Sequence, residues 1–505
     1  MYTVRIPIKT SPMDERYFNK CFFFAWKVNN ILVTHVKKRL ATLLNSKTYR
    51  RARQEYGSKF SKKAMKDRGI KKLSPKEKKR KDELVSIMNR EQKTVGLDKT
   101  SIYRYIAVQQ HKYSRYLSSH QAQAIANNVL TGAAKILYGD GTELHYKRAN
   151  DFDTISQKDG GGAALFKDWK HIRYKKKIFR LKTPDTEYMK AVISRHDPIK
   201  FCYLKRVEFN SGWKYYVVVI IDGEAPHKKK PDTKNKVGLD IGTSTVAADS
   251  DKAVMLENLA PNSIAYEKKI RHLQRLLDHK IRLANPFNYN PDGTVRKGRR
   301  HKWVITKAAK RLKRQIRVLY RKESAYVHCS HREQINRILA AAGEVIIEPV
   351  SVKSLQKKVK KTERNKKASV IKGKLVHKYK RKKRYGHSIK NHSPGYFIAE
   401  LKRKALLADI PYFEICTAKY KASQFHHDTG EYIKAPVEER YKEIEGKNVQ
   451  RDLYSAFLIR HTDNTLEKPD IPACERDFSN FVKLSNQKLA EMRSAGISNK
   501  ACWGF

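Results

Sequence analysis

The pattern of apolar and polar positions divides the first part of the chain into one strand and a block of helices. Tyr2–Ile8 alternates between apolar and polar residues, which is typical of a half-buried strand. Glu15–Leu44 repeats its apolar residues every three or four positions, which predicts a long helix. Lys47–Lys93 is polar and basic, with a capped helix start at Ser74. Ser101–Leu137 predicts two more helices.

Strands return after this helical block. Three alternating segments predict strands, at His171–Leu181, Ile199–Asn210 and Trp213–Ile221. We expect the N-terminal strand to join them, with the helices inserted between. His227–Asn235 is basic and contains a proline, so it is interpreted as a linker to a further domain. The pattern therefore predicts an α+β multidomain protein.

Beyond the linker, a short apolar run carries a single acidic residue. Val237–Ile241 predicts a buried strand with Asp240 inside it, and Gly238 and Gly242 flank that acid. Gly242 is expected to let another backbone or a phosphate approach closely. Burying a carboxylate without a partner costs several kcal/mol, so a metal ion or a basic group must accompany it. A structural ion pair with a basic side chain would compensate the buried charge of Asp240 as well as a metal ion would.

Two further acidic residues follow in similar settings. Glu348 ends a second apolar strand at Gly343–Val350, and Asp452 lies near the start of a predicted helix at Asn448–Ile459. The three acids thus lie on a first strand, at the end of a later strand and on a late helix. This is the order found in RNase H-like nucleases. Two Mg²⁺ ions can hold the attacking water and the leaving oxygen of a phosphodiester, and they require converging carboxylates.

Basic residues dominate the segments between these acids. Ser263–Ala284 and Trp303–Ala342 predict two helices with Lys and Arg on one side, suited to a duplex backbone. Val352–Arg384 holds 16 Lys or Arg and one acid, Glu363. Such a run is often disordered. Its position directly after Glu348 also favours a mobile segment beside the active site that orders on nucleic acid.

Composition indicates a polyanionic partner. The 505 residues include 109 Lys and Arg against 50 Asp and Glu, a net charge of +59. Self-repulsion of this size destabilises a fold unless a polyanion neutralises it, and nucleic acid is the obvious one. A membrane surface is the alternative, but no apolar run is long enough to cross a bilayer. The six scattered cysteines suit a reducing cytosol, and no signal peptide is seen, so we expect a cytoplasmic, prokaryotic, nucleoid-associated protein.

The three acidic segments resemble the RuvC-I, RuvC-II and RuvC-III motifs of the TnpB family, the transposon-encoded relatives of type V CRISPR effectors. Lys268–Arg275 resembles the basic helix after the first motif, and His392–Phe397 resembles the segment before the last strand. The resemblance covers Phe152–His461 and matches the N-terminal part only by layout.

The resemblance implies an RNase H-like (RuvC) α/β nuclease domain and an N-terminal wedge β-barrel that is interrupted by a helical recognition domain. The implied domains are a wedge strand at 1–12, the recognition domain at 13–143, the wedge barrel at 144–233, the nuclease domain at 234–415 with a helical insertion at 262–342 and a basic segment at 352–384, a degenerate zinc-ribbon-like insert at 416–447, the RuvC-III helix at 448–465 and a C-terminal tail at 466–505.

The function implied is that of an RNA-guided DNA endonuclease, which cuts double-stranded DNA next to a short target-adjacent motif. Asp240, Glu348 and Asp452 would bind two Mg²⁺ ions, and Arg451 would contact the scissile phosphate or form a structural salt bridge. The guide would be a transposon-end RNA or a CRISPR RNA, and the sequence leaves this choice open. Candidate nucleic-acid contacts, for which core packing is the alternative, are Tyr103, Tyr105, Lys112, Tyr113, Arg115, Lys268, Lys269, Arg271, Arg275, Lys357 and Lys358.

The family usually carries a zinc ribbon with two Cys-x-x-Cys pairs between the second and third motifs. The matching stretch here, Lys421–Gly430, has no cysteine. Cys416, His426 and His427 are the only candidate ligands, and zinc requires four in paired turns. We therefore expect no zinc, although these three residues with a distant fourth ligand would be an alternative.

Three other functions are open. A binding-only regulator would keep the fold and lose an acid, whereas all three acids are present. A guide-independent, structure-specific nuclease would share the site but would not need the basic N-terminal half. A DDE transposase typically has Glu as its third acid and needs helix-turn-helix modules, which the pattern does not indicate.

Overall fold

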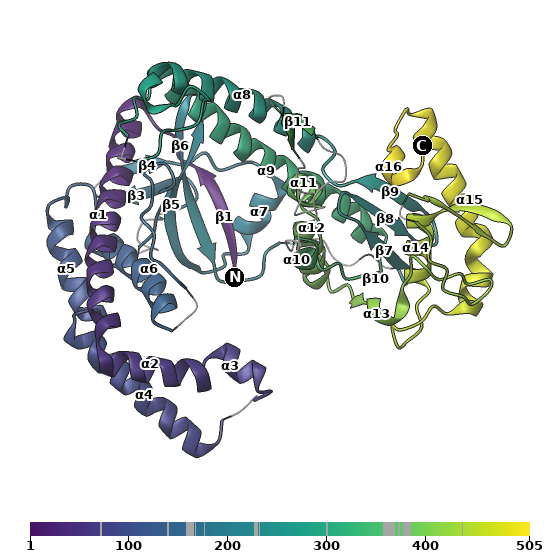
Figure 1. Cartoon of the computed structure of the whole chain (residues 1–505), viewed down its shortest axis with the longest axis horizontal. Helices are drawn as coiled ribbons and strands as arrows, with labels where there is room; N and C mark the ends of the chain where they lie inside the picture. The colour runs from purple at the N-terminus through teal and green to yellow at the C-terminus, as the bar shows by residue number, and fades with distance from the viewer. Residues whose placement is uncertain are drawn as a thin grey trace. The chain divides into compact units, whose positions relative to one another are not determined.

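The computed structural model divides the chain into two units, Met1–Pro226 and His227–Phe505 (Figure 1). It describes residues 1–70, 73–138, 141–157, 166, 168–175, 177–226, 231, 233–298, 301–356, 369–371, 374–376, 385–436 and 438–505. Within these ranges, no helix is both long and apolar enough to span a membrane.

An antiparallel sheet with the strand order β1-β6-β5-β2 forms the centre of the N-terminal unit. The N-terminal strand joins the later strands as predicted, and Tyr2 pairs with Ile221. The predicted single strand His171–Leu181 is wrong, because the chain reverses near Lys175, whose φ is +57°, and forms the hairpin β3–β4. The strands of this unit are β1 (Tyr2–Pro7), β2 (Thr154–Ile155), β3 (His171–Tyr174), β4 (Lys177–Arg180), β5 (Ile199–Phe209) and β6 (Gly212–Ile221).

Helices inserted after β1 make up most of the rest of this unit. The long helix α1 begins earlier than its apolar period predicts, because Ser11 caps it with a capping box and Pro12 occupies the first turn. Its apolar side, including Phe18 and Phe22, packs in one core with the sheet. The helices are α1 (Pro12–Asn45), α2 (Lys47–Lys59), α3 (Lys62–Asp67), α4 (Pro75–Thr94), α5 (Lys99–His111), α6 (Ser119–Leu137) and α7 (Glu187–Ser194).

The C-terminal unit contains a five-stranded mixed sheet with the order β13-β10-β7-β8-β9. The first three strands in sequence are antiparallel neighbours, and β10 and β13 run parallel to β7. Its strands are β7 (Lys236–Ile241), β8 (Thr245–Asp249), β9 (Val254–Asn258), β10 (Glu344–Ile347) and β13 (Tyr412–Glu414). Two small hairpins complete the strands, β11 (Ser369–Ile371) with β12 (Lys374–Val376), and β14 (Tyr441–Ile444) with β15 (Lys447–Gln450).

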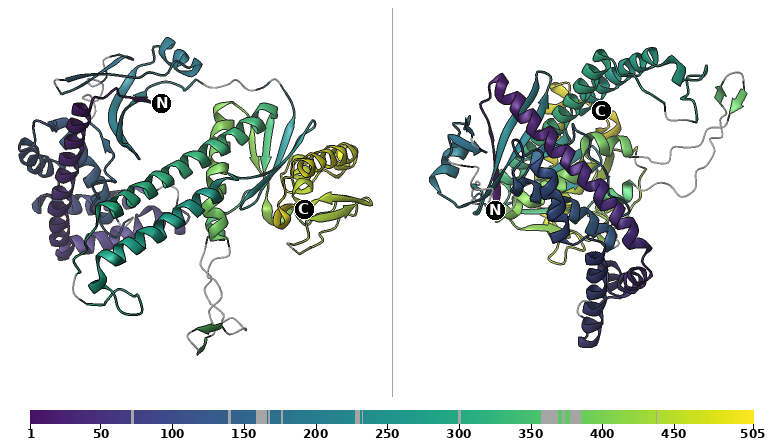
Figure 2. Two further views of the ribbon diagram at one scale, coloured as in Figure 1. Left: turned by 90° about the horizontal axis from the view of Figure 1, so that it is seen from above. Right: turned by 90° about the vertical axis from the view of Figure 1, so that its left-hand side faces the viewer.

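Helices cover both faces of this sheet. On one face α12 and the end of α9 pack in a core with Leu239 and Ile347, and on the other α14 and α15 pack in a core with Ile346. The helices α8 and α9 form an antiparallel pair (Figure 2). The helices are α8 (Ser263–Ala284), the short 3₁₀ helix at Pro286–Asn288, α9 (Lys307–Ala341), α10 (Val352–Leu355), α11 (Gly386–His392), α12 (Pro394–Leu407), α13 (Thr417–Tyr420), α14 (Arg451–Arg460), α15 (Ile471–Ser494) and α16 (Lys500–Trp503).

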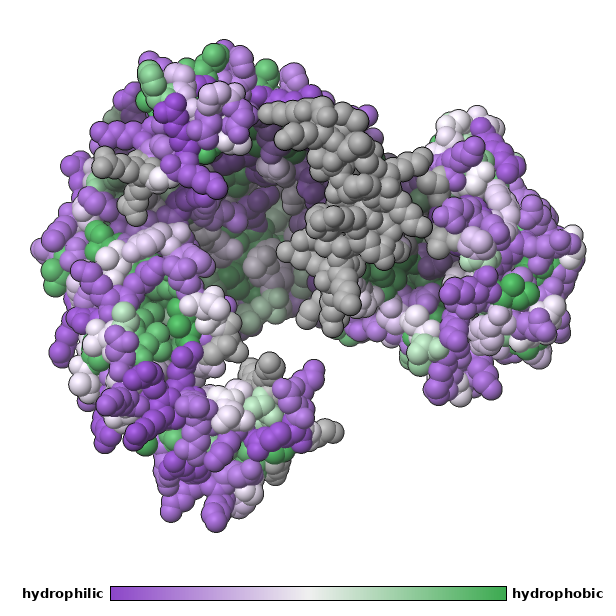
Figure 3. Space-filling view, in the orientation of Figure 1, coloured by the Kyte–Doolittle hydropathy of each residue, from purple (hydrophilic) through white to green (hydrophobic). Residues whose placement is uncertain are grey.

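The segment 466–505, which the sequence predicts as a C-terminal tail, packs into the core of the C-terminal unit. Helix α15 buries Phe478, Phe481 and Leu489 in the core that also contains Phe457 of α14, and Trp503 is 1% exposed. Hydrophilic residues otherwise cover most of the visible surface of both units (Figure 3).

Candidate active site

Two of the three predicted acids lie side by side on neighbouring parallel strands. Ile347 of β10 pairs with Leu239 of β7, and the Glu348 amide donates to the Leu239 carbonyl at 3.2 Å. Side chains alternate between the two faces of a sheet, so Asp240 and Glu348 share the face opposite Leu239 and Ile347. That is the face covered by α14.

Gly238 explains how α14 reaches this face. A Cβ atom at Gly238 would lie 2.2 Å from the Ala456 carbonyl oxygen and 2.4 Å from the Arg460 amide nitrogen. The helix backbone therefore packs directly on the strand. Asp452 precedes Ala456 by one helical turn on the same side of α14, and Asp240 follows Gly238 by two residues on the same side of β7. The close approach was predicted at Gly242 instead, which has Thr245 as its nearest neighbour.

Electrostatics shows that the three carboxyl groups influence one another. Burial raises the pKa of Asp240 well above its ordinary value, and the charges of Asp452 and Glu348 raise it further. Burial also raises the pKa of Glu348 and of Asp452. The nearby Arg451 guanidinium opposes these effects at Asp240 and Asp452. The three carboxyl groups thus share a poorly solvated region, where a cation would stabilise their charged forms.

The donor chemistry fits a magnesium site. Within the described ranges no basic side chain forms an ion pair with Asp240 or Glu348, so the structural ion pair that was the alternative for Asp240 is not seen there. Hard cations prefer carboxylate oxygens. The described side chains nevertheless include no three His, Cys, Asp or Glu already gathered closely enough to hold one metal ion. The residues supply the right ligands, and a metal would have to draw them together.

Arg451 is anchored to the loop before β14. Its Nη1 donates to the carbonyls of Pro436 at 3.3 Å and of Glu439 at 3.1 Å, and its Nε lies 3.6 Å from Asp452 Oδ1. These contacts favour the structural salt bridge over the phosphate contact, because the guanidinium already has partners in the protein.

The far end of α14 holds an ionic network that sequence reasoning missed. Arg460 is 4% exposed, and its guanidinium nitrogens lie 3.0 Å from Asp249, 3.0 Å from Asp251 and 3.1 Å from Asp477. His461 Nε2 lies 2.8 Å from Asp477. The sequence signal for this network is Asp249, an acid within a buried strand. Like Asp240, it needs a basic partner or a cation to offset the cost of burying its charge.

The three tyrosines among the predicted nucleic-acid contacts of the N-terminal unit have partners within that unit. Tyr103 donates to Asn127 Oδ1 at 2.7 Å, Tyr105 stacks on His35 with ring centroids 3.5 Å apart, and Tyr113 stacks on Phe24 at 4.7 Å. These contacts fit the alternative of core packing for the tyrosines. Lys112 and Arg115 are exposed.

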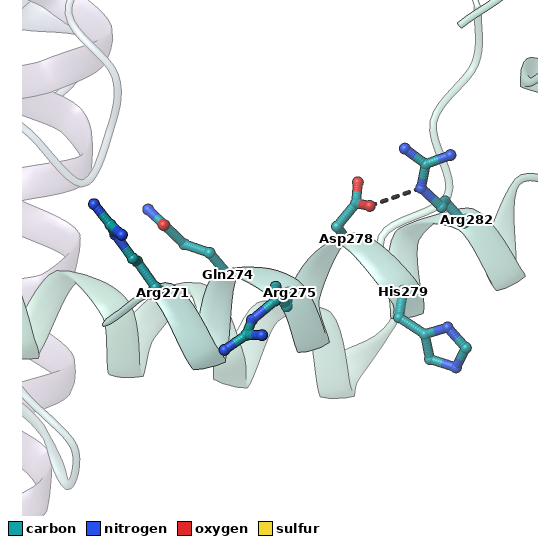
Figure 4. Close-up of a pocket in the computed structure, with 6 residues that line it drawn as sticks. All are labelled: Arg271, Gln274, Arg275, Asp278, His279 and Arg282. Atoms are coloured by element: carbon teal, nitrogen blue, oxygen red, sulfur yellow. Dashed lines mark hydrogen bonds and ion pairs between the residues drawn. The ribbon is translucent and has the colours of Figure 1, made fainter. Parts of the chain in front are cut away.

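The predicted contacts on α8 lie on exposed surface. Lys268 and Lys269 are exposed, and Arg271 pairs with Glu267 at 2.5 Å. Arg271 and Arg275 line a hollow of about 690 Å³ along one side of α8 (Figure 4). The other residues that line it are Gln274, Asp278, His279 and Arg282. Lys357 and Lys358, with most of the basic segment, lie outside the described residues.

The three candidate zinc ligands occupy different settings. His427 is 1% exposed, with its Nδ1 2.8 Å from Tyr454 Oη and its Nε2 3.3 Å from Glu445. Burial lowers the pKa of His426. Cys416 is half-buried at the start of α13. The absence of zinc stays a prediction.

Comparison with known proteins gave structural matches only. No protein-family model matches the chain, and no curated protein matches it. Among solved structures, a Cas12f1 complex with single-guide RNA and target DNA is similar at 11% identity and a TM-score of 0.38, covering 91% of this chain and 98% of the other. A CRISPR–Cas12f ternary complex is similar at 12% identity and a TM-score of 0.26, covering 91% and 99%.

Proposed function

We propose that this chain is an RNA-guided DNA endonuclease of the TnpB or compact type V effector kind, with a RuvC-like active site. The observation that carries the proposal is the arrangement of Asp240, Glu348 and Asp452. Two neighbouring parallel strands and one helix packed on Gly238 bury Asp240, which raises its pKa, and the charges of Asp452 and Glu348 raise it further. Perturbed acids of this kind are concentrated at catalytic and metal sites.

The architecture around the acids supports an RNase H-like domain. In sequence order, the acids lie on β7, which is the first strand of the sheet β13-β10-β7-β8-β9, directly after β10, which is the fourth, and on α14, which comes after all five strands. That is the order the motifs predict for a RuvC-like nuclease. We extend the proposal to the N-terminal unit, whose strands and inserted helices would serve as the wedge and recognition domains.

Asp240, Glu348 and Asp452 would hold Mg²⁺ through carboxylate oxygens. Bound there, Mg²⁺ would activate water and stabilise the leaving oxygen of a phosphodiester. Arg451 and Arg440 reduce the cost of ionising Asp452 beside the other two acids. Through its bonds to the carbonyls of Pro436 and Glu439, Arg451 also fixes the start of α14 and thereby the position of Asp452.

The net charge of +59 supports an RNA guide and a DNA target as partners. The basic side chains spread over α4, α8 and α9 would neutralise the phosphates of an extended nucleic acid. Base pairing with a bound RNA would then supply the sequence specificity, as in other guided nucleases.

The test is to replace each acid by alanine in the protein copurified with its RNA. We expect Asp240→Ala, Glu348→Ala and Asp452→Ala each to abolish cleavage while nucleic-acid affinity stays within a few-fold, since basic surfaces are untouched. Mn²⁺ binding measured by calorimetry should weaken in the same variants. Asp185→Ala, whose side chain is 88% exposed in the N-terminal unit, is the control.

Retained cleavage in any of the three variants would remove that residue from the site. Sequencing the copurified nucleic acid tests the guide. One RNA species whose variable end directs cutting to matching DNA is expected. A mixed population, with cutting that ignores added guide sequence, would instead indicate the guide-independent nuclease.

A further inference from the structure

A hollow of about 570 Å³ in the N-terminal unit gathers five basic side chains. They come from three separate segments: the first turns of α1, the turn after α5 and the hairpin β3–β4. Its volume lies in the range of ordinary small-ligand sites. The basic side chains are Arg16, Lys20, Arg115, Lys175 and Lys177.

Hydrogen bonds hold these three segments together. Lys175 Nζ donates to the carbonyls of Ser114 at 2.6 Å and of Leu117 at 3.1 Å, and Tyr174 Oη donates to the Tyr116 carbonyl at 3.0 Å. The hollow is therefore a built feature rather than a chance gap between surface side chains.

The charges in this hollow lack counter-charges. In the part of the chain that the structure describes, none of the five basic side chains forms an ion pair with a carboxylate. Elsewhere in the unit, cations such as Lys37 and Arg80 do, with Glu143 and Glu55 at 2.7 Å. Cations that converge without an ion-pairing carboxylate favour an anionic ligand.

Two tyrosines form an aromatic wall in the same hollow. The Tyr116 ring stacks on Phe24 with centroids 5.0 Å apart and lies 5.9 Å from the Tyr17 ring. Lys177 Nζ lies 4.8 Å from the Tyr17 centroid, and Lys20 Nζ lies 6.0 Å from the Tyr116 centroid. An aromatic surface beside unpaired cations suits a planar base attached to a phosphate.

We propose that this hollow binds one nucleotide of a nucleic-acid strand. Arg16, Lys20, Arg115 and Lys177 hold its phosphodiester groups, and its base packs against the wall formed by Tyr17 and Tyr116. Lys175 instead ties the hairpin to the turn after α5 through its two backbone carbonyl partners. The proposal rests on the proposed function, which supplies RNA and DNA strands as ligands, and it names a place where the N-terminal unit grips one of them.

The first experiment measures affinity against salt concentration for single-stranded RNA and single-stranded DNA oligonucleotides, with the full chain. The test variant combines Arg16→Gln, Lys20→Gln and Arg115→Gln. The matched control combines Lys47→Gln, Arg50→Gln and Arg51→Gln, which remove three exposed cations from α2. Each phosphate contact to a single strand contributes about 0.7 to the slope of log affinity against log salt. Loss of the contacts to the two phosphodiester groups that flank the bound nucleotide should therefore reduce this slope by about 1.4 in the test variant.

The salt-dependence slope of the control variant should fall by less than half as much as that of the test variant. The strand type that shows the difference, RNA or DNA, is the ligand. If the slope fell equally in the two variants, or in neither, the proposal would be overturned. Binding would then depend on the overall positive charge of the protein and not on this hollow. If the unmodified protein binds no nucleic acid at all, the proposed function fails first, and this distinguishes the two failures.

The second experiment does not depend on charge. Met13 lines the hollow and is 77% exposed, so a photo-reactive benzoyl-phenylalanine in its place should cross-link the bound strand. The same group in place of Val108, which is 61% exposed on α5, is the control. Cross-linking at position 13 should exceed that at position 108 several-fold, and competition with unlabelled strand should abolish it. Equal yields at both positions would refute the site.

Discussion

Replacing Gly238 by alanine tests how α14 brings Asp452 to the sheet. The added Cβ would lie 2.2 Å from the Ala456 carbonyl oxygen and 2.4 Å from the Arg460 amide nitrogen. Ordinary contacts of a Cβ begin near 3.4 Å, so strand and helix must separate by about 1 Å. Both neighbours are backbone atoms of a buried helix, which cannot turn aside as a flexible side chain can.

Overpacking of a core costs about 1–3 kcal/mol and occasionally more, and this site belongs at the upper end because no side chain can yield. We expect the free energy of unfolding of the C-terminal unit to fall by about 3 kcal/mol. A displacement of about 1 Å between catalytic groups can reduce turnover about 100-fold, so cleavage should fall by a similar factor. Chemical denaturation and single-turnover cleavage measure the two effects.

Gly57→Ala is the control. Gly57 lies within α2, and its added Cβ would meet no atom within 4 Å, so helix propensity alone predicts stabilisation by about 0.5–1 kcal/mol. If Gly238→Ala left both the unfolding free energy and the cleavage rate unchanged, α14 would not be positioned by this contact, and the account of the site would be refuted.

Two predictions concern the network at the other end of α14. Above pH 7, where Asp249 is ionised, Arg460→Met leaves Asp249, Asp251 and Asp477 without their shared counter-charge. We expect a loss of about 3–5 kcal/mol in denaturation experiments at about pH 8. Arg476→Met, at a position 71% exposed, should cost less than about 1 kcal/mol, and similar losses in both variants would contradict a buried network. Burial raises the pKa of Asp249 to about 7, although Arg460 opposes the shift, so the folded protein holds a proton that the unfolded chain has released. This contribution to stability is fully present below about pH 4 and is lost as the pH rises through 7. Unfolding free energies measured from pH 4 to 8 should therefore fall less steeply in Asp249→Asn than in the unmodified protein, and parallel curves would show that Asp249 does not titrate in this range.

The sequence by itself determined which segments form strands and helices, and where the acids fall among them. Strict alternation marks Tyr2–Ile8, and three- and four-residue spacing marks α1, because these periods follow from backbone geometry alone. An acid inside the apolar run of β7 was recognisable as needing a partner, because burying an uncompensated charge is costly wherever the chain folds. The turn inside His171–Leu181 was missed because both arms of that hairpin alternate alike, and the reversal depends on one residue adopting a positive φ.

Only the tertiary structure decided how the acids meet. Parallel pairing of β10 with β7 places Glu348 beside Asp240 across more than 100 residues of sequence, and no local pattern specifies that register. The role of Gly238 was invisible for the same reason, since the atoms that exclude a side chain there belong to α14. Likewise, the partners of Arg460 come from β8, from the turn after it and from α15. Propensity acts between neighbours in sequence, whereas an active site and a buried ion network consist of contacts that exist only once distant segments have packed.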